Sequence, residues 1–130
     1  MKGRDTMAVD GIHAATVYVS DQTAALAWYQ EVLGFEVRAN NPFEGTNRWI
    51  EVAPAGSDAA IVLIHGFGGW SPEKVGTDTG IILRSRDVPG TCQDLQDRGV
   101  VFDMPAQEFP WGWNAIFRDL DGNRFVLGSA

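Results

Sequence analysis

Aromatic side chains gather in three loop-like stretches of this sequence, where they are placed to stack against other flat groups. The chain has five tryptophans and seven phenylalanines, and many of them stand among glycine, proline and asparagine residues. The three stretches are NNPFEGTNRW at 40–49, HGFGGWSP at 65–72 and EFPWGW at 108–113. Rings presented by loops either cover a hydrophobic core or line a pocket for a flat ligand. The sequence leaves both interpretations open.

Side chains that bind metals or act as nucleophiles are few. The single cysteine, Cys92, excludes a disulfide within the chain and a thiolate metal cluster. Cys92 falls on the apolar stripe of a predicted helix, so we expect it to be buried rather than reactive. The stretch DLDGN at 119–123 lacks the spacing of a calcium loop, because its glycine comes two positions too early. Its composition favours a hairpin turn instead.

Composition and charge narrow the class of protein. The net charge of −7 argues against nucleic acid or an anionic membrane as a partner, since both attract basic surfaces. No stretch approaches the roughly 18 continuous apolar residues of a membrane span, and the start MKGRDTMAVDG lacks the apolar core of a secretion signal. We therefore expect a cytoplasmic protein with one domain over 11–130, after a flexible extension over 1–10.

The elements that must position the aromatic rings are a series of strands and two helices. Asp21 and Asp87 are placed to cap the two helices, and Leu26, Tyr29 and Leu33 lie on one face of the first. Val88, Cys92 and Leu95 form the corresponding apolar stripe of the second helix. Helices are predicted over 22–34 and 88–99, and strands over 12–20, 35–39, 48–54, 59–65, 80–85, 100–104, 113–119 and 123–128.

The order of these elements repeats. Each predicted helix ends in a glycine that a strand follows at once, LGFEV in one half and RGVVF in the other. The chain thus consists of two β-α-β-β-β repeats, at 11–66 and 79–128, joined by a linker over 67–78. A mixed α+β domain is expected, with its helices on one side of a curved sheet.

Three stretches in this order resemble the vicinal oxygen chelate superfamily, which includes glyoxalase I, bleomycin-resistance proteins, fosfomycin-resistance enzymes and extradiol dioxygenases. The stretches are VYVSDQTAALAWYQEVLGFEVR, GIILRSRDVPGTCQDLQDRGVVF and WGWNAIFRDLDGNRFVL. The resemblance implies eight strands in an open, U-shaped sheet around a cavity, two helices outside it, and often a homodimer.

Metal enzymes of this family carry His or Glu ligands on four cavity-lining strands. By position, the resemblance carries these ligands to Ala14 (or His13 if the first strand slips by one residue), Val62, Gly80 and Val126. Alanine, valine and glycine offer no donor atom to a metal ion. A metal site could form only if the strand register slipped at both His13 and His65, so that these histidines turned inward beside a carboxylate such as Glu51. We therefore expect no metal and no other cofactor.

The alternation of side chains along strands predicts which other residues face the cavity. Glu51 is expected to pair with one of the arginines, because an unpaired buried charge is costly. The loop residues Trp70 and Phe109 are expected near the opening, and Thr16, Ile64, Ile82 and Ala115 on the walls. The predicted ligand-binding residues are Tyr18, Trp49, Glu51, Arg84, Trp111, Trp113, Phe117 and Arg124.

Three functions remain open on these observations. The first is metal-independent binding of a small planar or aromatic molecule, as in the bleomycin-resistance branch, with a homodimer as the expected assembly. The second is an enzyme of the same superfamily, a glyoxalase-like lyase or isomerase or a dioxygenase, with Glu51 or Tyr18 as general acid or base. The third is a protein–protein interaction domain that uses its aromatic loops.

Overall fold

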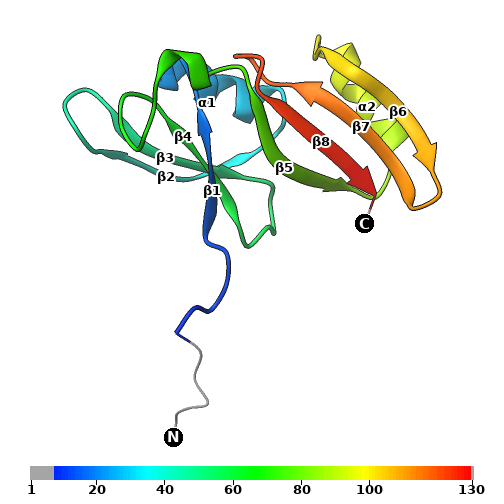
Figure 1. Cartoon of the computed structure of the whole chain (residues 1–130), viewed down its shortest axis with the longest axis horizontal. Helices are drawn as coiled ribbons and strands as arrows, with labels where there is room; N and C mark the ends of the chain where they lie inside the picture. Colours follow the sequence, from blue (N-terminus) through cyan, green and yellow to red (C-terminus); the bar gives the residue numbers. More distant parts are fainter. Residues whose placement is uncertain (1–7, 130) are drawn as a thin grey trace, which may run out of the picture.

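The chain forms two modules in sequence, each with four strands and one helix (Figure 1). The computed structural model describes residues 8–129, so the first seven residues of the expected N-terminal extension lie outside the described residues. The first module contains β1 (Ala14–Tyr18), α1 (Gln22–Glu31), β2 (Glu36–Pro42), β3 (Arg48–Ala53) and β4 (Ala60–Ile64). The second contains β5 (Asp78–Ser85), α2 (Val88–Asp97), β6 (Phe102–Phe109), β7 (Gly112–Arg118) and β8 (Arg124–Ser129), and a short 3-10 helix, η1 (Pro72–Lys74), lies in the linker.

Both modules have the same strand order. The strand order is β1-β4-β3-β2 in the first sheet and β5-β8-β7-β6 in the second. The β1–β4 and β5–β8 pairs are parallel, and the other neighbouring strands are antiparallel. The edge strands β1 and β5 lie at the centre of the molecule (Figure 1). The predicted α+β fold of two βαβββ repeats with eight strands is confirmed. Within residues 8–129, no helix is long and apolar enough to cross a membrane.

Both helices begin where the sequence predicts. The Asp21 carboxylate accepts a hydrogen bond from the Ala24 N–H, and Asp87 accepts one from the Gly90 N–H, each at 3.0 Å. The second helix buries its predicted stripe of Val88, Cys92 and Leu95, whereas the first buries Ala25 and Tyr29 and leaves Leu26 half-exposed. Burial raises the pKa of the Cys92 thiol, which favours the unreactive protonated form.

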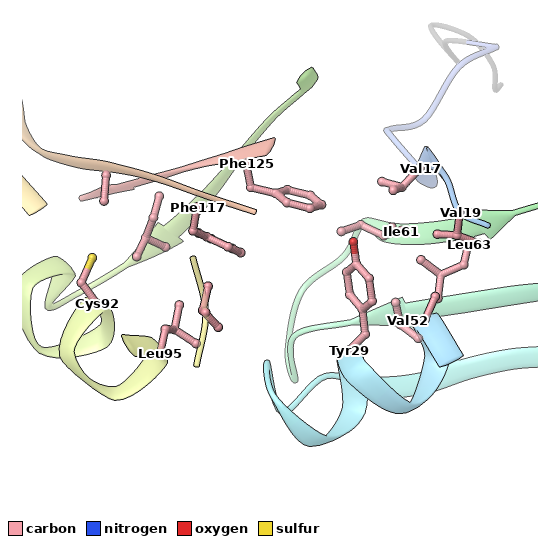
Figure 2. Packing of buried hydrophobic residues seen from close by; sticks show 14 of the residues in the cluster. Val17, Val19, Tyr29, Val52, Ile61, Leu63, Cys92, Leu95, Phe117 and Phe125 are labelled. Carbon is pink, nitrogen blue, oxygen red and sulfur yellow. The ribbon is translucent and has the colours of Figure 1, made fainter. Parts of the chain in front are cut away.

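The core lies between the sheets and the helices. In the strands other than the exposed edge strand β2, alternate side chains point inward, including Val52 and Ile61 from the first sheet and Phe117 and Phe125 from the second (Figure 2). The ring of Tyr29, on α1, lies 6.3 Å from that of Phe125 and links the two halves of this core. Burial of these side chains supplies the main stabilisation of both modules.

A buried polar network also joins the modules. The Tyr29 hydroxyl donates to Asp119 Oδ2 at 2.6 Å, and the Asn123 backbone N–H donates to Asp119 Oδ1 at 2.8 Å. The Asn123 side-chain amide donates to the Tyr18 carbonyl at 2.9 Å and accepts from the Gly76 N–H at 2.8 Å. One asparagine therefore ties the second module to β1 and to the linker.

The stretch DLDGN forms the predicted turn between β7 and β8. Gly122 has φ +86°, which a residue with a side chain rarely adopts. The turn presses against the linker at Gly76, where an added Cβ would lie 3.0 Å from the Asp121 carbonyl oxygen. The Asp121 carboxylate accepts hydrogen bonds from Ser20, just after β1. These contacts hold the turn in place at the junction of the modules.

Tyr29→Phe tests this junction, because it removes one hydroxyl and keeps the ring. Losing the bond to Asp119 should lower the free energy of unfolding by about 1–3 kcal/mol at neutral pH. Burial raises the pKa of Tyr29 well above its ordinary value. Above pH about 10, the unfolded chain loses a tyrosine proton that the native state keeps, so wild-type stability falls as pH rises.

The difference between wild type and Tyr29→Phe should therefore shrink above pH about 10, because the variant lacks this loss. Urea unfolding of the wild type and of Tyr29→Phe at pH 7, 9, 10 and 11 measures the difference in the free energy of unfolding and its change with pH. A difference that stays constant across this range would contradict the assigned role of the hydroxyl.

Candidate functional site

Each sheet has one face turned away from its helix, and these two faces carry the candidate site. We call them the first and second open faces. Residues of the first open face alternate with the core residues Val17, Ile50 and Ile61, and those of the second alternate with Leu83, Phe117 and Phe125. The first open face includes Thr16, Tyr18, Trp49, Glu51, Val62 and Ile64, and the second includes Ile82, Arg84, Ile116, Arg118, Arg124 and Val126.

Three aromatic rings meet at one end of the first open face. Phe43 lies 4.6 Å from Phe67 and 5.7 Å from Trp49, and the rings of Trp49 and Phe67 are stacked at 6.2 Å, all measured between ring centroids. Phe43 keeps 51% of its surface exposed. Phe43 and Phe67 are site residues that the sequence prediction missed; their glycine-containing loops were noted, but strand alternation cannot orient a loop side chain.

Glu51 lies beside this aromatic cluster with only 12% of its side chain exposed. The Trp49 indole N–H donates to Glu51 Oε2 at 2.8 Å, and His13 Nε2 lies 3.3 Å from the same oxygen. The predicted pairing of Glu51 with an arginine is wrong, because Arg124 turns to Asp103 on its own sheet. His13 reaches Glu51 because it precedes β1, where strand alternation does not fix its direction.

The linker covers the end of the first open face next to β1. The Tyr18 hydroxyl donates to the Gly68 carbonyl at 2.9 Å, and Lys74 Nζ lies 5.6 Å from the centre of the Tyr18 ring, a cation–π contact. The Trp70 indole N–H donates to the Val19 carbonyl at 2.9 Å, and its ring packs on His65. Trp70 is thus held against the end of β1.

The second open face combines arginines with aliphatic side chains. Arg118 pairs with Asp103 at 2.7 Å, and Arg124 lies 3.9 Å from the other oxygen of the same carboxylate. Ile82 is 71% exposed and pairs in register with Val126, the position where the resemblance implied a metal ligand. An isoleucine this exposed on a sheet face is a candidate contact for a ligand or a partner.

The orientation predicted for Phe117 and Ala115 is wrong. Both are buried in the core, with Phe117 stacked on Phe125 at 5.6 Å, and Trp113 on the same strand packs against that core. The prediction placed Phe117 by analogy with Glu51. Glu51 pairs with Val62, eleven positions later, whereas Ile116 pairs with Val126, only ten positions later. The second hairpin is one residue shorter, which moves every side chain of β7 to the opposite face.

Trp111 lies apart from the other predicted site residues, at the tip of the β6–β7 hairpin. It is 74% exposed, stacks on Phe109 at 4.9 Å and donates its indole N–H to Asn114 Oδ1. The structure therefore brings Tyr18, Trp49 and Glu51 together on one face. It places Arg84, Arg124 and Trp111 on the other sheet.

The metal site of the family does not fit the residues present. The four positions carry Ala14, Val62, Gly80 and Val126, whose side chains have no donor atoms. His65 Nδ1 lies 3.1 Å from the Val19 carbonyl oxygen, to which it can only donate, and His65 does not join His13 and Glu51. Across residues 8–129, no three His, Cys, Asp or Glu side chains lie close enough together to hold a metal ion.

Known proteins with this fold are similar over nearly the whole chain. TnmS3, an antibiotic binding protein from Streptomyces sp. CB03234, is 38% identical with a TM-score of 0.81, covering 95% of this chain and 98% of TnmS3. A superfamily member from Sphaerobacter thermophilus DSM 20745 is 35% identical with a TM-score of 0.85, covering 95% of this chain and all of that one. The Bacillus subtilis (strain 168) protein YetH is 31% identical over 116 residues, 89% of this chain and 95% of YetH.

The sequence profile of one family matches residues 11–127, which include every strand and helix from β1 to β7 and most of β8. The two βαβββ modules, their strand order and the close relatives agree with this match. The chain belongs to the Glyoxalase/Bleomycin resistance protein/Dioxygenase superfamily.

Proposed function

We propose that this protein binds a small planar or aromatic molecule on its first open face without using a metal. The observation that carries the proposal is the aromatic cluster of Phe43, Trp49 and Phe67 beside the carboxylate of Glu51. Flat rings supply stacking surface, and a single carboxylate gives the ligand a preferred orientation. Tyr18, the last residue of β1, lies on the same face, and its hydroxyl is bonded to the linker carbonyl of Gly68.

The similarity to TnmS3 supports a binding function for this chain. That protein is an antibiotic binding protein, and it shares 38% of its residues with this chain over almost its full length. The absent metal donors at Ala14, Val62, Gly80 and Val126 support the same choice, since the metal-dependent chemistry of the superfamily needs them.

The charge of the site favours a cationic ligand. Glu51 is held by Trp49 and approached by His13, and neither of these groups carries a fixed positive charge. Aromatic faces attract cations, and the net charge of −7 raises the local concentration of positively charged molecules. A planar cation would be attracted by the net charge of the chain, stack on the aromatic rings and pair with the Glu51 carboxylate.

Binding is tested by titrating proflavine, a planar cation, and anthraquinone-2-sulfonate, a planar anion, while recording tryptophan fluorescence. Proflavine should quench the emission, because Trp49 lies in the aromatic cluster. Glu51→Gln should weaken proflavine binding about tenfold, the effect of roughly 1.4 kcal/mol. Glu31→Gln, at the exposed end of α1, is the matched control and should change nothing. Two results would rule out the role of Glu51. One is equal affinity of the wild type for proflavine and anthraquinone-2-sulfonate, and the other is equal affinity of Glu51→Gln and Glu31→Gln for proflavine.

We also propose that the protein is a homodimer in which a second copy helps to cover the open faces. Three large apolar side chains remain exposed on or next to the two sheets: Ile82 at 71%, Phe43 at 51% and, at the tip of the β6–β7 hairpin, Trp111 at 74%. Ile82 lies on the second open face and Phe43 in the aromatic cluster, so a second copy packed against these faces would cover apolar side chains. In such a dimer the exposed Trp111 of the second copy can add a further ring beside the aromatic cluster.

Ile82→Asp tests the dimer, because a carboxylate in an apolar interface is costly to bury. Sedimentation velocity should show a dimer for the wild type and a monomer for Ile82→Asp. Ile12→Asp, at an equally exposed isoleucine before β1, is the control and should stay dimeric. A wild-type protein that sediments as a monomer at every concentration would remove this part of the proposal.

A metal-independent enzyme is the second candidate, and the His13–Glu51 pair favours it. A histidine and a largely buried carboxylate 3.3 Å apart can exchange a proton with a bound substrate. If the pair is catalytic, the chelator-treated protein should isomerise the hemithioacetal of methylglyoxal and glutathione, and both His13→Gln and Glu51→Gln should abolish turnover. Absence of any turnover in the wild type would leave binding as the supported function.

A further inference from the structure

A large cavity lies between the two modules and is lined by residues of both. It has a volume of about 740 Å³, within the range of ordinary small-molecule sites. One wall is the turn between β3 and β4, from Pro54 to Ala59, and the opposite wall is the last part of β5 with the start of α2. We call it the intermodule groove. It shares only Ile82 and Arg84 with the open faces.

The floor of the intermodule groove is apolar. Ile61 contributes from the first module, and Leu95 and Phe117 contribute from the second (Figure 2). Other floor residues are Leu33, Phe35, Ile81, Leu83 and Leu127. Four of them, Leu33, Phe35, Ile81 and Leu83, are packed against the core but only partly buried. An apolar floor that stays open to water favours an apolar occupant.

The rim of the groove is basic and hydroxylic. Arg84 and Arg86 are both exposed there, and Ser85 Oγ lies 2.8 Å from Thr91 Oγ1 beside them. The ion pairs within residues 8–129 use other arginines, so neither Arg84 nor Arg86 has a carboxylate within 4 Å in this part of the chain. Two such guanidinium groups on a chain of net charge −7 are complementary to an anion.

We propose that the intermodule groove binds an amphipathic organic anion, a carboxylate on an alkyl body of about twelve carbons. The apolar floor receives the body, and Arg84 and Arg86 hold the carboxylate at the rim. The described part of the chain's own N-terminal segment, residues 8–13, leaves β1 away from β5 and does not fill this groove (Figure 1). None of the aromatic-cluster residues lines this groove, so proflavine and dodecanoate test the two sites separately, although Ile82 lies both in the groove and in the proposed dimer contact.

Isothermal titration calorimetry with dodecanoate, below its micelle concentration, tests the site. Dodecanoate should bind the wild type and bind Arg84→Gln/Arg86→Gln at least about tenfold more weakly, whereas Arg84→Lys/Arg86→Lys should stay within about threefold of wild type. Ala55→Trp fills the mouth of the groove from the turn and should abolish binding. Ala55→Ser is its matched control and should bind as the wild type does.

The outcomes separate the possible occupants. Loss of dodecanoate binding in Ala55→Trp, with proflavine quenching unchanged, supports a second site. No binding of dodecanoate to the wild type overturns the proposal, and so does binding that Arg84→Gln/Arg86→Gln leaves intact. If Ala55→Trp instead converts a dimer to a monomer in sedimentation, the groove holds a second copy of the chain and the proposal is wrong.

Discussion

The buried bonds of Asn123 are the constraint on which the arrangement of the two modules depends. Each module has its own sheet and helix, and at their junction the bonds of Asn123 act together with the Tyr29–Phe125 ring contact and the Ser20–Asp121 hydrogen bonds. Asn123 bonds the β1 carbonyl of Tyr18, the linker amide of Gly76 and the carboxylate of Asp119, which in turn accepts from Tyr29 on α1. Buried polar groups need every partner, because leaving one unpaired costs much of the stability of a small domain. The network therefore stabilises this relative placement of the modules.

The two open faces differ in chemical character, because the two repeats carry different side chains at equivalent positions. Glu51 on the first open face corresponds to Ile116 on the second, since each pairs with the valine of the neighbouring strand. The same scaffold thus presents an aromatic, acidic face on one sheet and an aliphatic, arginine-bearing face on the other. The repeat supplies two similar surfaces, and a few outward-facing residues give them different chemical character.

Charge is distributed unevenly over this acidic chain. The first open face holds Glu51 among aromatic rings, while arginines gather on the second sheet and at the end of β5. The net charge of −7 attracts cations at long range. Which ligand binds at a given site depends on the charged groups within a few ångströms of that site. The proposed planar-cation site and the proposed organic-anion groove are therefore compatible on one acidic chain.

The sequence by itself determined the secondary structure, the repeat and the family. Capping aspartates, terminal glycines and apolar strands are local signals, and they predicted both helices and the existence and order of all eight strands. They ended β2 and β6 too early: these strands continue to Pro42 and Phe109, beyond the predicted ends at 39 and 104. It also placed Tyr18, Trp49 and Glu51 on one face, because alternation along a strand is local too. Only the tertiary structure decided the rest. A hairpin one residue shorter turned Phe117 into the core, loop geometry brought Phe43 and Phe67 to Trp49, and packing of the modules created the intermodule groove. Pairing register, loop direction and module packing depend on residues far apart in the chain, which no local pattern records.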